Sequence, residues 1–380
     1  MNYATLELEA LASQKCRDAR YTDNNQLRLK MQFRHKFLKY GVLVCFSFAV
    51  INVSAQQPKD KIASESSTFT FSLENDLFGD TDQQYTSGIQ IGWISADVAH
   101  YQQALDLPDW MFRYLPFIPH SGAQKNIGIN IGQKIFTPED LESRVVIGDD
   151  RPYAGWLYGA LSFISKTEKR LDTVEFQLGV IGPAALGEDA QNSIHDLRGL
   201  PTAKGWANQL ENEPGIAIIY ERKWRPFRSS EPRGFGYDVI THAGGALGNV
   251  YTYLSAGLEA RIGWNLPADF GTSLMRPGGN SSAPTTYNDP RLTSQAKFGA
   301  HLFAGVTGIF KARDIFLDGN TFTDSHDVNK EYVVGDLVLG ASIIVDRIKL
   351  SYAQVFRTRE FEKQDIKHNF GSVSISFTFD

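Results

Sequence analysis

Hydrophobic and hydroxyl side chains alternate strictly at the end of this chain. Val373, Ile375, Phe377 and Phe379 occupy every second position, with serine or threonine between them. Because successive side chains of a β-strand point to opposite faces, this pattern predicts a strand with one apolar and one polar face. Both a membrane-spanning β-barrel and a soluble β-sandwich are built from such strands.

The alternation recurs along the chain and predicts about twelve strands. The candidate strands are residues 68–75, 87–97, 125–134, 154–166, 172–181, 214–226, 234–244, 250–265, 293–311, 333–346, 347–358 and 369–379. This even number is typical of single-chain outer-membrane barrels.

One of these segments indicates which face would meet lipid. Between residues 254 and 264, apolar residues alternate with polar residues that include Glu259 and Arg261. A charge on the lipid face costs about 2 to 4 kcal/mol near the bilayer midplane, so we expect both side chains to face the lumen. Tryptophans stand near predicted strand ends, where membrane barrels carry an aromatic girdle. They are Trp93, Trp156, Trp224 and Trp264.

The N-terminal part has the layout of a secretory signal. Basic residues at 34–39 precede an apolar run at 40–53, and Ser54 and Ala55 follow it. This layout predicts cleavage after Ala55, and the run is too short for a comfortable membrane span. The expected division of the chain is an upstream extension that does not fold (1–30), a signal peptide (31–55) and one β-barrel domain (56–380).

Composition agrees with export. The two cysteines, Cys16 and Cys45, both precede the expected cleavage point, so the mature chain is expected to lack thiols. The formal charge of -5 and the lack of a basic stripe give no support to nucleic-acid binding. The chain is 42% hydrophobic, yet no apolar run of helical spanning length follows the signal. We therefore predict an all-β protein, a transmembrane antiparallel β-barrel of about twelve strands in the bacterial outer membrane.

The connections between strands divide into two sets. If the first strand starts in the periplasm, connections after odd strands lie at the cell exterior. The exterior set then includes 76–86, 135–153 and 182–213, and the inner set includes 98–124 and 266–292. Within the exterior set, Ala184 to Arg198 lacks proline and β-branched runs, which predicts a short helix ended by Gly199.

The first exterior connection gathers oxygen-bearing side chains. They are Glu74, Asn75, Asp76, Asp80, Asp82 and Thr86. Hard oxygen ligands at this density suit Ca²⁺, although the spacing is not that of an EF-hand. An ordinary hairpin loop rich in aspartate and asparagine has the same composition.

A second group lies on the predicted helix. Gln191 and His195 are four residues apart, so they share a helix face. A neutral histidine can act as a general base, with the glutamine orienting the imidazole or a substrate oxygen. A surface helix without a function gives the same spacing.

A third group is the stretch DDRPYAGWLYG at residues 149–159. Here we expect Asp150 and Arg151 to form a structural ion pair, with Pro152 and Gly155 setting the turn into the next strand. The chain has no GxSxG, HExxH or phosphate-binding glycine motif, so a serine-hydrolase or zincin interpretation has no support.

Together these motifs resemble those of the LpxR family of outer-membrane lipid A deacylases. The resemblance rests on END at 74–76, YTSG at 85–88, DDRPYAGW at 149–156, GVIGP at 179–183 and GWANQLENEPG at 205–215. The motifs occur in the same order over the whole mature chain, and their combination is specific.

The resemblance implies a twelve-stranded barrel that removes the 3′-acyloxyacyl group of lipid A, or of lipopolysaccharide, in a Ca²⁺-dependent reaction at the cell exterior. Carried over by motif, the site residues are Asn75, Asp76, Thr86, Gln191 and His195. The family has a loop lysine shortly after a TP or SP pair. Here Thr137 and Pro138 are followed by no such lysine, and Arg144 is the residue that would replace its charge.

On this interpretation, His195 takes a proton from the water that attacks the ester, and Gln191 positions His195 or the substrate. Asp76, with Asn75 and Thr86, holds the Ca²⁺ that stabilises the oxyanion. Two other functions fit the same residues. One is a phospholipase acting on glycerophospholipid esters, and the other is a non-enzymatic barrel, either a porin or a scaffold, with structural Ca²⁺.

Overall fold

The computed structural model describes the greater part of the chain. The described residues are 65–76, 84–105, 123–229, 233–272, 274–276, 282–286, 288–293, 297–364 and 368–380. The expected upstream extension, the signal peptide with its cleavage after Ala55, and Asp80 and Asp82 lie outside these ranges.

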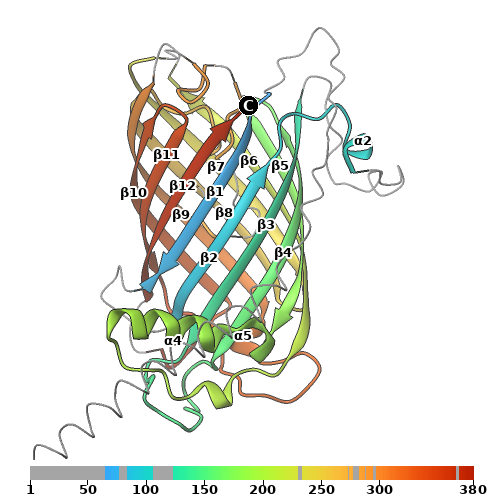
Figure 1. Ribbon diagram of the computed structural model, residues 1–380, viewed down its shortest axis with the longest axis vertical. Coiled ribbons are helices and arrows are strands. Elements are labelled where there is room, and N and C mark those ends of the chain that lie inside the picture. Colours follow the sequence, from blue (N-terminus) through green and yellow to red (C-terminus); the bar gives the residue numbers. More distant parts are fainter. Residues whose placement is uncertain are drawn as a thin grey trace, which may run out of the picture. The chain divides into compact units, whose positions relative to one another are not determined.

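Twelve antiparallel strands of the described residues close into a barrel (Figure 1). They are β1 (Ser67–Asn75), β2 (Gln84–Ile94), β3 (Gln124–Thr137), β4 (Ala154–Lys166), β5 (Arg170–Ile181), β6 (Glu213–Arg228), β7 (Phe235–Gly248), β8 (Tyr251–Trp264), β9 (Phe298–Asp314), β10 (Val333–Val345), β11 (Ile348–Arg357) and β12 (His368–Phe379). Each strand pairs with its neighbours in sequence, and β1 pairs with β12, so no sheet edge is left open. The predicted fold class is confirmed.

The side chains of the strands separate into a lumen face and an outer face. In β8, Leu254, Leu258 and Ile262 are exposed, whereas Arg261 is only 1% exposed and lies in the lumen. The expected facing of β8 is therefore correct, and the exposed apolar belt is typical of a barrel that crosses a membrane.

The predicted aromatic girdle is only partly correct. Trp224 and Trp264 are exposed on the outer face, but Trp156 is fully buried. Trp156 has the inward-facing parity of β4, and its ring stacks on Tyr158 at 5.5 Å between centroids. It therefore belongs to the interior and not to a girdle.

The two ends of the barrel carry different connections (Figure 1). Connections after odd strands form one end, which we call the helix end because it carries α4 (Gly187–Arg198) and α5 (Ile315–Asp318). Connections after even strands form the opposite end, called the turn end, which includes α2 (Tyr101–Leu105) and the C-terminus. In the described part of the chain, no helix has both the length and the apolar character needed to cross a bilayer.

The predicted helix begins later than expected. Pro183–Ala185 forms a 3₁₀ turn, η2, and Leu186 adopts a left-handed conformation with φ 58°, which interrupts the helical path. The α-helix α4 therefore starts at Gly187 rather than Ala184. Gly199, with φ 69°, ends it as predicted, because glycine takes the left-handed conformation without a side-chain clash.

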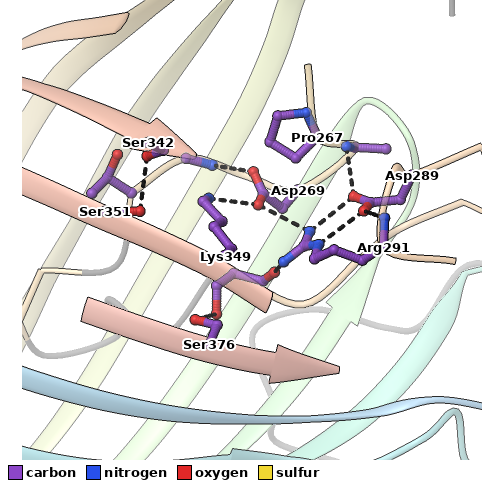
Figure 2. A network of polar contacts seen from close by, with 12 residues as sticks. Pro267, Asp269, Asp289, Arg291, Ser342, Lys349, Ser351 and Ser376 are labelled. Carbon is purple, nitrogen blue, oxygen red and sulfur yellow. Dashed lines mark hydrogen bonds and ion pairs between the residues drawn. The ribbon is translucent and has the colours of Figure 1, made fainter. Parts of the chain in front are cut away.

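The connection between β8 and β9 folds back into the barrel. We call its described residues from Asn265 to Thr293 the lumen segment. Asp269 lies within it, and its carboxylate accepts from Arg261 at 2.6 Å and Lys349 at 2.7 Å, two strand residues near the turn end (Figure 2). The expectation that 266–292 stays at the inner side is therefore incomplete, because the segment satisfies charges that point into the lumen.

Candidate active site

The end of β1 brings three predicted site residues together. β1 ends at Asn75, so Asp76 leaves the alternation of the strand and is fully buried. Thr86 lies at an irregularity in the pairing of β2 with β3, between Tyr85 and Ser87. Asn75 Nδ2 donates to the Thr86 carbonyl oxygen at 3.0 Å, which fixes the end of β1 to the bulge.

The bulge is also fixed to β3. The hydroxyl oxygens of Thr86 and Thr137 are 2.6 Å apart and hydrogen-bonded, and both residues are buried. With strict alternation along β2, Thr86 would share the lumen face with Gly88, two residues further on. The bulge therefore lets Thr86 contact the last residue of β3.

The outer surface of the wall is covered at this point. Ile131 and Ile135 share the outward parity of β3, yet Ile131 is 42% exposed and Ile135 only 2%. Ile135 packs with Trp206 and with Ala190 of α4. Gln133 Nε2, on the same strand, donates to the Ala185 carbonyl oxygen just before α4 at 2.6 Å. Helix α4 thus lies against the outer surface of the wall at the helix end of the barrel.

His195 lies on the buried face of α4 and is held by the chain that follows the helix. Its Nδ1 atom is 2.6 Å from the Pro201 carbonyl oxygen. The turn at Gly199 brings Pro201 back, because the Leu200 N–H donates to the His195 carbonyl at 2.9 Å. A carbonyl can only accept, so Nδ1 carries the proton, and in the neutral ring Nε2 is left as the basic nitrogen.

Gln191 shares the buried face of α4 with His195, as predicted, and each is 2% exposed. Trp206 Nε1 donates to Gln191 Oε1 at 2.8 Å. Indole N–H is only a donor, so this contact assigns the orientation of the amide. The Gln191 Nε2 atom is buried and has no hydrogen-bond partner among the described residues.

A close approach holds Trp206 in place. A Cβ atom at Gly187, the first residue of α4, would come within 2.8 Å of the Trp206 ring, so only glycine fits there. On its other side, Trp206 packs on Tyr153 at 5.0 Å between ring centroids. The η3 turn (Trp206–Asn208) is therefore fixed against both α4 and the start of β4.

The expected ion pair between Asp150 and Arg151 is wrong. The Arg151 guanidinium bonds Glu360 at 3.0 Å, and it lies over the rings of Phe136 and Phe361. Asp150 instead accepts backbone N–H groups, including that of Arg151 at 2.7 Å. Adjacent residues point apart along an extended chain, which sends Arg151 inward.

Glu360, in the connection between β11 and β12, gathers three cations. Arg151, Lys311 and Arg357 all bond its carboxylate. Burial alone would raise the pKa of Glu360, but Lys311, Arg357 and Arg151 together hold that pKa well below its ordinary range. This ionised cluster supports the connections at the helix end.

Two other predicted residues do not join the site. The Glu74 side chain has the lumen parity of β1, opposite to that of Asn75, and accepts from Met275 of the lumen segment. Arg144 is exposed, and its backbone carbonyl accepts from Asn208 at 3.0 Å. Among the described residues, the Arg144 side chain makes no hydrogen bond or ion pair.

The chemistry of the residues around Asp76 fits a hard cation. Asp76 offers a buried carboxylate, and Asn75 and Thr86 offer amide, hydroxyl and carbonyl oxygens close beside it. Within the described ranges, no three histidine, cysteine, aspartate or glutamate side chains converge to hold a metal ion by themselves.

Comparison with known proteins places the chain in a family. The model of a family described as outer membrane protein LpxR matches residues 42–379. The structure of LpxR from Salmonella typhimurium is similar, with a TM-score of 0.64 and 21% identity over 82% of this chain and 100% of that chain. At this identity, the likeness shows the fold.

Two other solved barrels are similar to a lesser degree. The β domain of the Bordetella autotransporter Brka has a TM-score of 0.38 and 10% identity, over 83% of this chain and 99% of that chain. The translocator domain of the autotransporter NalP from Neisseria meningitidis has a TM-score of 0.31 and 9% identity, over 94% and 98%. Neither carries an argument about function.

A search of curated proteins found no match. The family model alone spans most of the chain, from before the first strand to the last residue of β12. The chain therefore belongs to the family of the outer membrane protein LpxR.

Proposed function

We propose that this outer-membrane barrel is a hydrolase that removes the 3′-acyloxyacyl group of lipid A, with its site facing the cell exterior. The observation that carries the proposal is the position of Gln191 and His195. Both lie on the buried face of α4, the helix whose Ala190 packs with Ile135 on the outer surface of the barrel wall.

This position suits a substrate that is anchored in a membrane. The apolar belt of the wall, with residues such as Ile131, continues directly towards the covered Ile135. A lipid that diffuses in the bilayer would reach α4 along the wall without entering the lumen. The lumen itself is crossed by the lumen segment, an arrangement that disfavours an open porin.

His195 would act as the general base. With its Nδ1–H donated to Pro201, Nε2 takes a proton from a water molecule, and that water attacks the carbonyl carbon of the ester. The tetrahedral intermediate then collapses, the ester C–O bond breaks, and the protonated Nε2 returns its proton to the leaving alkoxide oxygen. The products are the carboxylic acid of the acyloxyacyl group and a hydroxyl on the lipid.

Gln191 would orient the substrate. Because Trp206 occupies Gln191 Oε1, the buried Nε2 presents N–H groups, which suit a carbonyl or ester oxygen. Pro201 occupies His195 Nδ1, so we assign Gln191 to the substrate and not to that nitrogen of the histidine.

Asp76, together with Asn75 and Thr86, would hold a Ca²⁺ ion. When bound, the ion would supply positive charge for the oxyanion that develops on the ester carbonyl. The protein's own contribution is to fix these donors: the Asn75 amide is tied to the Thr86 backbone, and the Thr86 hydroxyl to Thr137.

The experiment is a lipid A mass profile. Cells expressing the wild-type chain should show lipid A that has lost an acyloxyacyl unit, and chelation of Ca²⁺ in membranes should stop the loss. Asp76→Asn should stop it too while the barrel keeps its heat-modifiable gel mobility. An unchanged lipid A profile together with fatty acid released from glycerophospholipid would show that glycerophospholipid, and not lipid A, is the substrate.

A further inference from the structure

We propose that the lumen segment positions the candidate site from behind, through a clamp on the backbone of Met275. This inference rests on the proposed function, because it concerns the same site. The Met275 N–H donates to Glu74 Oε1 at 2.8 Å, and its carbonyl accepts from Lys134 Nζ at 2.9 Å. Two opposite charges, from β1 and β3, thus hold both backbone polar groups of one residue.

The clamp lies on one row of the sheet. In the strand pairing, Glu74 is opposite Gly88, and Gly88 is opposite Lys134. All three residues face the lumen, and Met275 lies over the glycine between the two charges. A Cβ atom at Gly88 would meet the Tyr85 hydroxyl first and would come within 3.0 Å of Met275 Cε, so the absence of a side chain there makes room for both side chains.

This row is directly behind the candidate site. Glu74 precedes Asn75, whose side chain points to the other face of the wall. Gly88 follows Thr86 by two residues, and Lys134 precedes Thr137 by three. The clamp therefore fixes, from the lumen, the strand ends that carry Asn75, Thr86 and Thr137, with Asp76 directly after Asn75.

Burial makes the clamp a stringent support. Glu74, Lys134 and Met275 are each less than a tenth exposed. A buried charge needs compensation. Loss of either Glu74 or Lys134 therefore removes one bond to the Met275 backbone and leaves the remaining charge without the opposite one. At the turn end, Asp269 anchors the lumen segment to the barrel strands through Arg261 and Lys349 (Figure 2). The lumen segment is thus held at both ends of the lumen.

The protein contains a matched control for Lys134. Lys166, near the turn end of β4, is also a buried lysine, and its Nζ donates to the Pro284 carbonyl of the lumen segment at 2.8 Å. The two lysines therefore make the same kind of contact with the same segment, one behind the candidate site and one remote from it. Any general effect of loosening the segment should appear in both.

The test compares Lys134→Met, Lys166→Met, Glu74→Ala and Glu74→Gln in the full-length protein. The readouts are Ca²⁺ binding by titration calorimetry in detergent, the Ca²⁺ concentration for half-maximal deacylation, and heat-modifiable mobility as the folding control. Lys134→Met and Glu74→Ala should each raise the Ca²⁺ dissociation constant and the half-maximal Ca²⁺ concentration about tenfold. This is the effect of losing one charge-assisted hydrogen bond. Lys166→Met should stay within about twofold of the wild type.

Glu74→Gln separates positioning from mere stability. Its amide oxygen still accepts from Met275, so it should recover most of the Ca²⁺ affinity that Glu74→Ala loses. The clamp would be overturned, with the proposed function intact, by either of two results. One is a wild-type Ca²⁺ dependence of deacylation in both Lys134→Met and Glu74→Ala, and the other is an equal loss of Ca²⁺ affinity in Lys134→Met and Lys166→Met. A wild-type protein that neither binds Ca²⁺ nor deacylates lipid A would instead overturn the proposed function.

Discussion

His195 Nδ1 lies 2.6 Å from the carbonyl oxygen of Pro201, and this contact determines which ring nitrogen can act as a base. A carbonyl partner selects the tautomer that carries its proton on Nδ1, so Nε2 keeps its lone pair. The turn at Gly199 makes the contact, because it reverses the chain directly after α4. A helix end thus sets the chemistry of a side chain one turn earlier.

Trp206 should contribute to turnover by orienting Gln191. Trp206→Phe keeps a ring beside Gly187 and Tyr153 but removes the N–H that donates to Gln191 Oε1. Loss of one neutral hydrogen bond should lower the deacylation rate about two- to tenfold, with the barrel still folded. Trp264→Phe, on the exposed outer face of β8, is the control and should keep the wild-type rate. Equal deacylation rates in both variants would show that the hydrogen bond from Trp206 to Gln191 does not contribute to turnover.

Glu360 should make the helix end sensitive to acid. A carboxyl whose pKa is lower in the folded than in the unfolded state stabilises the fold above its unfolded pKa, which is about 4.3 for glutamate. That contribution is lost as the pH falls towards the folded pKa, which Lys311, Arg357 and Arg151 hold low against the effect of burial. The wild-type melting temperature should therefore drop on acidification below about pH 4.3.

Glu360→Gln tests this dependence. The variant should melt lower at pH 7, since breaking a buried charge pair costs about 3 to 5 kcal/mol, and its melting temperature should fall less with acid. The measurement is the temperature of the heat-modifiable gel shift at several pH values. Glu362→Gln, two residues on and exposed, is the control and should follow the wild type. Identical acid profiles for Glu360→Gln and the wild type would show that another carboxyl is responsible.

The lumen segment should block ion flow. The wild-type protein should give no stable conductance in planar bilayers, because Asp269 is held by Arg261, Arg291 and Lys349 within the lumen. Asp269→Asn leaves three buried cations with one counter-charge fewer, so the segment should loosen and conductance events should appear. Asp346→Asn, at an exposed pair with Lys297, is the control and should stay silent. A large steady conductance of the wild type would contradict the blocked lumen.

The barrel could be predicted from the sequence because its signal is local. Each strand shows its own period of two, and a charge such as Arg261 identifies the lumen face. The helix was also foreseeable, including its end at Gly199. Its start was not, because the left-handed conformation of Leu186 depends on packing between the 3₁₀ turn and the barrel wall. Likewise, the parity of Trp156 had to be counted from the strand register before its position could be judged.

The candidate site was foreseeable only in part. The motifs pointed to Asn75, Asp76, Thr86, Gln191 and His195, but they did not reveal all the groups that fix these residues. The Pro201 carbonyl is a backbone group, which no side-chain pattern reveals. Thr137 gave a signal that could have been used, since it ends β3, the strand that pairs with β2, close to Thr86 in the register. Glu74 was grouped with its neighbours in sequence, although alternation already assigns it to the other face.

The most direct test of the central claim compares two histidines of the same end of the barrel. His195 and His326 each place a ring nitrogen 2.6 Å from a backbone carbonyl oxygen, of Pro201 and Asp150 respectively. His195→Asn and His326→Asn therefore remove the same kind of contact, but only the first removes the proposed base. Both variants should keep heat-modifiable mobility.

The measurement is the rate at which purified protein releases the acyloxyacyl group from lipid A, followed by mass spectrometry. His195→Asn should lower this rate about 10²- to 10⁴-fold, the usual contribution of a general base, and should keep Ca²⁺ binding. His326→Asn should stay within about threefold of the wild type, because it leaves the proposed base unchanged. An active His195→Asn protein, or equal losses in the two variants, would contradict the account.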